Sequence, residues 1–126
     1  FAAPKVDPQA IALLQYAGGT TGVPKGAALT HANLSINAGQ LAAIDPGNGV
    51  REGRVLGALP LFHIFANSCI LNRSIMAGGT IALLARFDAG EALATIRRCK
   101  LTDLAGVPAM YQAMLDHPDC PKTSFA

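Results

Sequence analysis

Short apolar runs alternate with amphipathic stretches along most of this chain. Five runs have the length and apolar character of β-strands: residues 11–16, 26–29, 54–59, 80–85 and 103–107. The stretch after the second run carries apolar residues at helical spacing, namely Leu34, Ala38, Leu41 and Ala42. This alternation predicts an α/β fold, in which a β-hairpin is followed by β-α-β-α-β-α units with a mainly parallel sheet.

Residues typical of helix starts stand where these helices should begin. Thr30 is a good N-cap, and Asp88 with Glu91 has the spacing of a capping box. Pro108 suits the first position of the last helix. The residues expected to point inward from the last two helices are Leu93 and Ile96, and then the apolar stripe of Met110, Tyr111, Met114 and Leu115.

The most apolar stretch, residues 61–76, is interrupted by polar residues: His63, Asn67, Asn72 and Arg73. It is shorter than the roughly 20 residues that cross a bilayer, so we expect a buried helix over 64–77 and no transmembrane segment. A charged side chain inside such a helix needs a partner. The sequence reveals none for Arg73, and we expect that partner to lie outside the chain.

Composition narrows the class of protein. The 126 residues are 51% hydrophobic and only 14% charged, which is apolar for a small free-standing domain. The net charge of +2 is too weak to indicate nucleic-acid binding. Three cysteines, without a C-x-x-C pair, favour neither a zinc site nor a disulfide framework. We therefore expect the reducing cytoplasm, and peripheral attachment to the inner membrane is left open.

A glycine-rich loop follows the first apolar run. Its candidate binding residues are Gly18, Gly19, Thr20, Thr21, Gly22, Lys25 and Gly26. Glycines allow successive N–H groups to converge on an anion, while threonine hydroxyls and a lysine ammonium add donors. The loop suits a polyphosphate, although a plain mobile hairpin has similar glycine content. It is not a Walker A loop, which needs Gly-Lys followed by Ser or Thr, because here Pro24 precedes Lys25 and Gly26 follows it.

The whole string of residues 16–26, YAGGTTGVPKG, resembles the phosphate-loop signature of the acyl-adenylate-forming (ANL) superfamily. The nearest resemblance is to long-chain fatty-acid–CoA ligases, which are acyl-CoA synthetases. A second string, PLFHIFA at residues 60–66, resembles the second core motif of fatty-acid and aryl-CoA ligases. This resemblance implies that Phe62 and His63 border the substrate carboxylate. The residues alone favour the other interpretation, in which His63 caps the buried helix through its ring N–H.

Ligands of open parallel sheets bind at the carboxyl ends of the strands. Three such ends are expected on one side, at residues 60–63, 85–87 and 106–108, and an acyl pocket should form there. The resemblance implies that Gly106, Val107 and Pro108 line the acyl tunnel, whereas plain core packing is the alternative. The two remaining histidines receive structural roles. His31 starts a helix, and His117 lies near a helix end where its charge would complement the dipole.

The resemblance also implies the chemistry. A fatty acid or other carboxylic acid reacts with ATP to give acyl-AMP and pyrophosphate, and coenzyme A then displaces AMP. Lys25 would contact the β- and γ-phosphates, and Thr20 and Thr21 would donate hydroxyls. Mg²⁺ would be held by ATP, with Thr20 nearby. Related alternatives are an amino-acid adenylation domain or a luciferase-like enzyme, although the histidine after Phe62 favours a CoA ligase.

Two departures from the family pattern stand out. Ala17 occupies a position that often carries threonine, so one hydroxyl near the phosphates is missing. The family's adenine- and ribose-binding motifs and its C-terminal lysine have no counterpart in the string. We therefore expect residues 1–126 to form one partial domain of a larger N-terminal domain, with the C-terminal domain absent and no complete catalytic set. Alone it should be inactive and self-associate through apolar surface, and a non-catalytic self-associating module is the remaining alternative.

Overall fold

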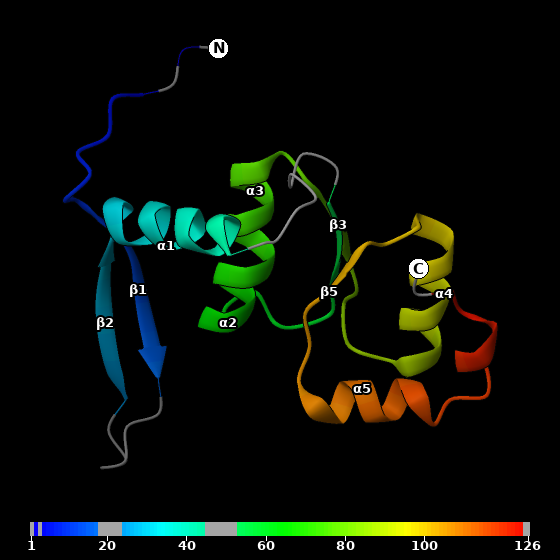
Figure 1. The fold of residues 1–126 in the computed structure, drawn as a ribbon. Coiled ribbons are helices and arrows are strands. Elements are labelled where there is room, and N and C mark those ends of the chain that lie inside the picture. Colours follow the sequence, from blue (N-terminus) through cyan, green and yellow to red (C-terminus); the bar gives the residue numbers. More distant parts are fainter. Residues whose placement is uncertain (1, 3, 18–23, 45–52, 125–126) are drawn as a thin grey trace.

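The computed structural model describes residues 2, 4–17, 24–44 and 53–124, and these contain two separate sheets (Figure 1). Strands β1 (Ile11–Ala17) and β2 (Lys25–Thr30) form an antiparallel hairpin. Strands β3 (Arg54–Gly57), β4 (Thr80–Leu83) and β5 (Asp103–Leu104) form a parallel sheet in the order β4-β3-β5. The predicted α/β class, with a hairpin before a parallel sheet, is confirmed.

The parallel strands are shorter than the apolar runs that predicted them. The run 54–59 leaves the sheet at Gly57, the run 80–85 at Leu83, and the run 103–107 at Leu104. At the end of β5 the Leu104 carbonyl accepts a hydrogen bond from a side chain, the Tyr111 hydroxyl, at 2.9 Å. The apolar residues past these points therefore form loops at the carboxyl edge of the sheet.

The helix starts follow the predicted residues. Thr30 caps α1 (His31–Ala43) and exchanges hydrogen bonds with Asn33 in a capping box. Asp88 caps α4 (Ala89–Cys99) by accepting from the Glu91 N–H at 2.9 Å. Pro108 is the first residue of α5 (Pro108–Leu115).

The predicted helix over 64–77 contains three segments. A short α2 (Ile64–Ala66) leads into a π-helix, η2 (Asn67–Asn72), and α3 (Arg73–Ala77) follows. The wider π turn brings residues five apart onto one face, and there the Asn72 side-chain amide donates to the Asn67 side-chain oxygen at 2.8 Å. Expecting one regular α-helix was therefore wrong in the middle of this stretch.

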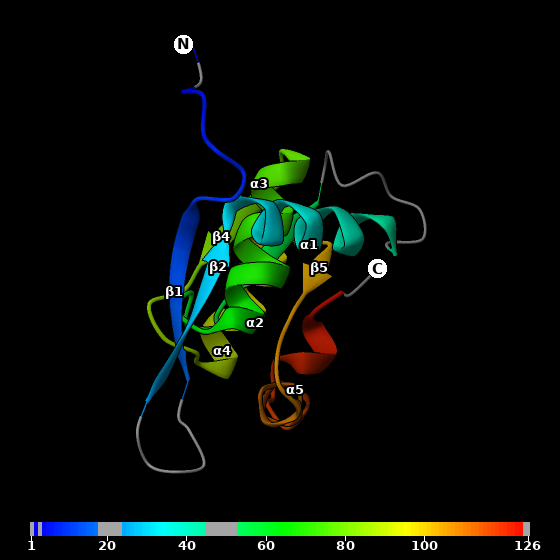
Figure 2. The ribbon, with the colours of Figure 1, turned by 90° about the vertical axis from the view of Figure 1, so that its left-hand side faces the viewer.

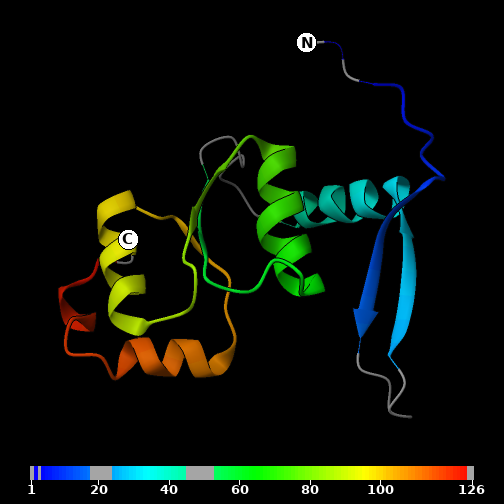
Figure 3. The same ribbon diagram turned by 180° about the vertical axis from the view of Figure 1, so that it is seen from behind.

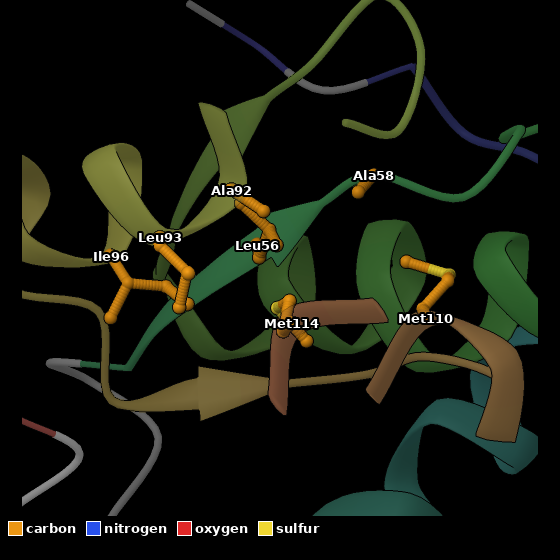
Figure 4. Close-up of a cluster of buried hydrophobic side chains, with 7 residues drawn as sticks. All are labelled: Leu56, Ala58, Ala92, Leu93, Ile96, Met110 and Met114. Atoms are coloured by element: carbon orange, nitrogen blue, oxygen red, sulfur yellow. The ribbon is translucent and has the colours of Figure 1, made fainter. Parts of the chain in front are cut away.

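Both faces of the central strand β3 are buried. Leu56 packs with α4 and α5 in a cluster shown in Figure 4: Leu56, Ala58, Ala92, Leu93, Ile96, Met110 and Met114. Its neighbour Val55 points to the opposite face and packs with Ala66 and Ile70. Most of the predicted inward residues lie in the first cluster, but Leu115 is exposed, so its assignment to the stripe was wrong.

An ion pair holds α3 to the sheet. The Arg73 guanidinium contacts the Asp103 carboxylate at 3.2 Å, and both side chains are partly buried. The expectation that the partner of Arg73 lies outside the chain was therefore wrong. Thirty residues separate the two, so only the fold brings them together.

The last described segment includes a 3-10 turn, η3 (Cys120–Lys122). Here the Asp119 N–H donates to Nδ1 of His117 at 3.2 Å. The other ring nitrogen lies beside Gly90 at the start of α4. The ring thus accepts a hydrogen bond in its own turn and packs on α4, which differs from the expected role at a helix dipole.

The hairpin stands apart from the sheet. Views from opposite sides show α1 and the α2–α3 region between the hairpin and the sheet, with α4 and α5 beyond it (Figure 1, Figure 3). The view turned by 90° shows the two hairpin strands extending away from the end of α1 at which the chain enters that helix (Figure 2). Among the described residues, no helix is long and apolar enough to pass through a membrane.

Candidate functional site

The hairpin brackets the glycine-rich loop. Gly18, Gly19, Thr20, Thr21 and Gly22 lie outside the described residues, whereas Lys25 and Gly26 begin β2. Strand pairing sets Ala17 opposite Lys25, so the two ends of the loop are neighbours. Lys25, the first residue of β2, is exposed.

Gly26 lies against the ring of Tyr16, which leaves little space for a larger residue at this position. It pairs with Tyr16, and a Cβ at Gly26 would lie 3.1 Å from Cε1 and Cζ of the Tyr16 ring. The ring therefore covers the glycine across the two strands. A role of Gly26 in binding phosphate stays a prediction beside this structural role.

Phe62 and His63 lie on the turn between β3 and α2. His63 is the N-cap of α2, and its Nδ1 accepts from the Phe65 N–H at 3.2 Å. The prediction that His63 caps this helix is confirmed. The predicted direction of the hydrogen bond was wrong, because the ring nitrogen accepts from a backbone N–H and does not donate. The neighbouring Phe62 side chain is 82% exposed.

An open hollow of about 820 Å³ lies at the carboxyl ends of β3 and β4. Its walls come from two loops and one residue of α5: Gly57, Ala58, Leu59, Pro60, Leu61, Phe62, Leu83, Leu84, Ala85, Arg86, Phe87 and Met110. The lining is almost wholly apolar, and Arg86 is its one charged side chain. Two of the three predicted strand ends therefore meet at one cavity, which has the size of a small-molecule site.

The third predicted end contributes differently. Gly106, Val107 and Pro108 are not among the residues that line the hollow. Gly106 instead lies beside the ring of Tyr111, where a Cβ would be 3.4 Å from Cζ of that ring. Met110, the third residue of α5, forms that part of the wall.

Gln15, which was not predicted as a site residue, connects the hairpin to the turn after β3. The Nε2 amide of Gln15, in β1, donates to the Phe62 carbonyl at 3.0 Å and to the Tyr16 carbonyl at 3.2 Å. The sequence offered one signal for this role, namely that Gln15 is a polar residue within the apolar run 11–16. The hairpin that carries the loop is thereby attached to the wall of the hollow.

The described residues contain no group of three or more His, Cys, Asp and Glu side chains that could hold a metal ion. Two of the three histidines accept backbone hydrogen bonds through Nδ1, as His63 does from Phe65 and His117 from Asp119.

Comparison with known proteins gives three kinds of match. The family model described as AMP-binding enzyme matches residues 1–125. A long-chain-fatty-acid–CoA ligase of Bacillus subtilis (strain 168) is 44% identical over 92% of this chain and 21% of its own length. A feruloyl-CoA synthase of an Amycolatopsis species is 40% identical over 86% of this chain and 22% of its own length. The chain thus spans about a fifth of these curated relatives.

Solved structures share the same arrangement. The N-terminal domain of FACL13 from Mycobacterium tuberculosis superposes with a TM-score of 0.85 at 28% identity, over 98% of this chain and 30% of that one. The O-succinylbenzoate coenzyme A synthetase of Bacillus subtilis, in complex with ATP and magnesium, gives a TM-score of 0.79 at 34% identity. That match covers 90% of this chain and 23% of that one.

Proposed function

The chain belongs to the AMP-binding enzyme family, and from this premise we propose that it is part of an ATP-dependent acid–thiol ligase. A carboxylate oxygen attacks the α-phosphorus of ATP, and the bond to the β,γ-pyrophosphate breaks. The thiol of coenzyme A then attacks the acyl carbonyl, loses its proton, and displaces AMP. The first step turns a poor acyl donor into one with a good leaving group.

The hairpin would supply the phosphate side of this reaction. Departure of pyrophosphate requires stabilisation of growing negative charge. In our proposal the phosphates are contacted by the loop N–H groups and the threonine hydroxyls. The residues are Gly18, Gly19, Thr20, Thr21 and Gly22, together with Lys25 and Gly26 at the end of the loop. Mg²⁺ enters as Mg·ATP, a substrate, with Thr20 close to it.

The turn after β3 would supply the acyl side. The observation that supports this proposal is a hydrogen bond from Gln15 to Phe62. It joins the end of the hairpin to the wall of an apolar hollow of about 820 Å³. In the proposal the acyl group occupies that hollow, and His63 lies near the carboxylate. Gly106, Val107 and Pro108 would act behind this wall, through Tyr111 and Met110, and not as its surface.

Long-chain fatty acids are the first candidate substrates, and the 44% identity to a fatty-acid ligase and the apolar lining support them. Hydroxycinnamic acids are the second candidate, because feruloyl-CoA synthase is nearly as similar, at 40% identity. Both classes carry an apolar body on a carboxylate. Residues 1–126 would form one segment of the N-terminal domain and be inactive alone, and we place the whole enzyme in the cytoplasm.

The test uses the full-length protein that contains this chain. Acid-dependent exchange of radiolabelled pyrophosphate into ATP is measured with palmitate, ferulate, coumarate and indoleacetate, followed by acyl-CoA formation. Exchange with one class and none of the others assigns the substrate, and no exchange with any acid contradicts an adenylating enzyme.

Lys25→Ala tests the phosphate role in the same assay. We expect kcat/KM for ATP to fall about a hundredfold, because a positive charge on the leaving phosphates is lost. Lys5→Ala, which removes another exposed lysine of the N-terminal region, is the matched control and should be silent. Equal activities of the two variants would contradict the role of Lys25.

A further inference from the structure

Gln15 connects two parts of the molecule that otherwise meet mainly through helix α1. Its own backbone belongs to β1, where it pairs with Ala27, and its side chain reaches the turn before α2. Forty-seven residues separate Gln15 from Phe62. Within the part of the chain that the structure describes, this hydrogen bond ties the hairpin directly to residues 53–124.

The chemistry of the contact requires a donor with two hydrogens. Nε2 faces two carbonyl oxygens, those of Phe62 at 3.0 Å and Tyr16 at 3.2 Å. Only the NH₂ end of the amide donates, and it carries two N–H bonds. The two carbonyl acceptors therefore determine which way the amide is oriented. One side chain thus holds two backbone segments at a defined spacing.

Both segments lie where small movements would matter. Tyr16 is two residues before Gly18, at the strand end that leads into the loop, and Phe62 stands on the wall of the hollow. The Phe62 side chain is exposed, although its neighbour Leu61 packs against a buried cluster and the His63 N–H donates to the Pro60 carbonyl at 3.0 Å. The bond from Gln15 adds a restraint that joins this turn to the hairpin.

We infer that Gln15 is a positioning residue, which holds the acyl-side turn in register with the hairpin that carries the phosphate loop. The inference rests on the proposed function, because it assumes that acid and ATP meet between these two segments. Misplacing one reactant by about 1 Å can cost about a hundredfold in rate. Loss of the amide should therefore lower kcat of adenylation while leaving the contacts that bind each substrate.

The test compares Gln15→Met and Gln15→Glu in the full-length enzyme, using acid-dependent pyrophosphate exchange. Methionine keeps the length of the side chain and removes both donors. We expect kcat to fall by about tenfold to a hundredfold, with KM for ATP and acid within about threefold of wild type. Gln40→Met is the matched control, since Gln40 is exposed on α1, and it should be silent.

Gln15→Glu adds a pH signature that a space-filling role would not produce. The ionised carboxylate repels both carbonyls, whereas the protonated carboxyl donates one hydrogen bond. The ratio of this variant's kcat to that of wild type should rise as the pH falls from about 8 to about 5.5, toward the ordinary glutamate pKa of about 4.3.

The outcomes separate the two proposals. Absence of exchange by the wild-type enzyme overturns the proposed function itself. An active wild type with Gln15→Met within about threefold in kcat overturns the inference. A loss of kcat that accompanies a lower unfolding midpoint, with a ratio for Gln15→Glu that is independent of pH, also overturns it and leaves Gln15 a purely structural residue.

Discussion

The hairpin and the central strand of the parallel sheet make opposite use of apolar residues. Leu56, in β3, and Leu93, in the covering helix α4, are completely buried between strands and helices of this same chain. In the hairpin, Ile11 is 61% exposed and Leu14 56% exposed. A region that buries its own apolar surface is a folding unit, whereas one that leaves it bare gains stability only when something else covers it. We expect the rest of the parent domain to cover the hairpin.

The largest expected effect is in the core between the parallel sheet and α4. Leu93→Ala removes a fully buried side chain from the cluster that joins β3, α4 and α5. It should lower the free energy of unfolding by about 2–5 kcal/mol, because a cavity is left behind. Urea unfolding of the 126-residue chain measures it. Leu115→Ala, at an exposed leucine of α5, is the control and should cost less than about 0.5 kcal/mol.

A second substitution, at Gly57, tests how closely β3 and β4 are packed. A Cβ at Gly57 would lie 2.7 Å from Cδ2 of Leu83 and 2.9 Å from Cγ2 of Ile81, on the neighbouring strand. Gly57→Ala should therefore destabilise the chain by about 1–3 kcal/mol through overpacking. Combining it with Leu83→Ala should recover part of that loss in a double-mutant cycle. Strict additivity of the two changes would show that Leu83 is not the obstacle.

The hairpin should respond weakly to the same kind of change. Leu14→Ala is expected to alter the unfolding free energy of the 126-residue chain by less than about 1 kcal/mol, since most of that side chain is already exposed. In the full-length protein the loss should be larger, because the side chain would be covered. Equal effects in both proteins would contradict the expectation that the rest of the domain covers the hairpin.

The smallest effect concerns the C-terminal turn. The Lys122 ammonium, 2.7 Å from the Asp119 carboxylate, lowers the pKa of Asp119 below its ordinary value of 3.8. A lowered folded pKa means that this contact stabilises the chain above pH 3.8 and ceases to do so as the pH falls through the folded value. The pair is exposed, so solvent screens most of its contribution.

Thermal unfolding of wild type and Asp119→Asn across the acid range measures this contribution. The midpoints should differ by about a degree or less at neutral pH and coincide at the acid end. A difference that grows as the pH falls would have the wrong sign for this ion pair.

Local patterns predicted much of the fold. Thr30, Asp88 and Pro108 mark helix starts because capping and the geometry of proline act within a few residues. The alternation of strand-like runs and amphipathic stretches was sufficient for the α/β class and the parallel sheet. The strand ends at Gly57, Leu83 and Leu104 were misjudged, because an apolar loop that lines a hollow has the same composition as a strand.

By itself, the sequence determined the order and type of the elements and the strings on which the family assignment depends. Both are local, since they depend on residues close together along the chain. Only the tertiary structure decided which distant groups meet: Arg73 with Asp103, and Gln15 with the carbonyl of Phe62. Such pairs leave no periodic signal, because their spacing in the sequence is set by the path of the chain and not by the contact. The ends of β3 and β4 were expected to lie together, but the contribution of Met110 to the wall of the hollow depends on how α5 packs and was decided by the fold.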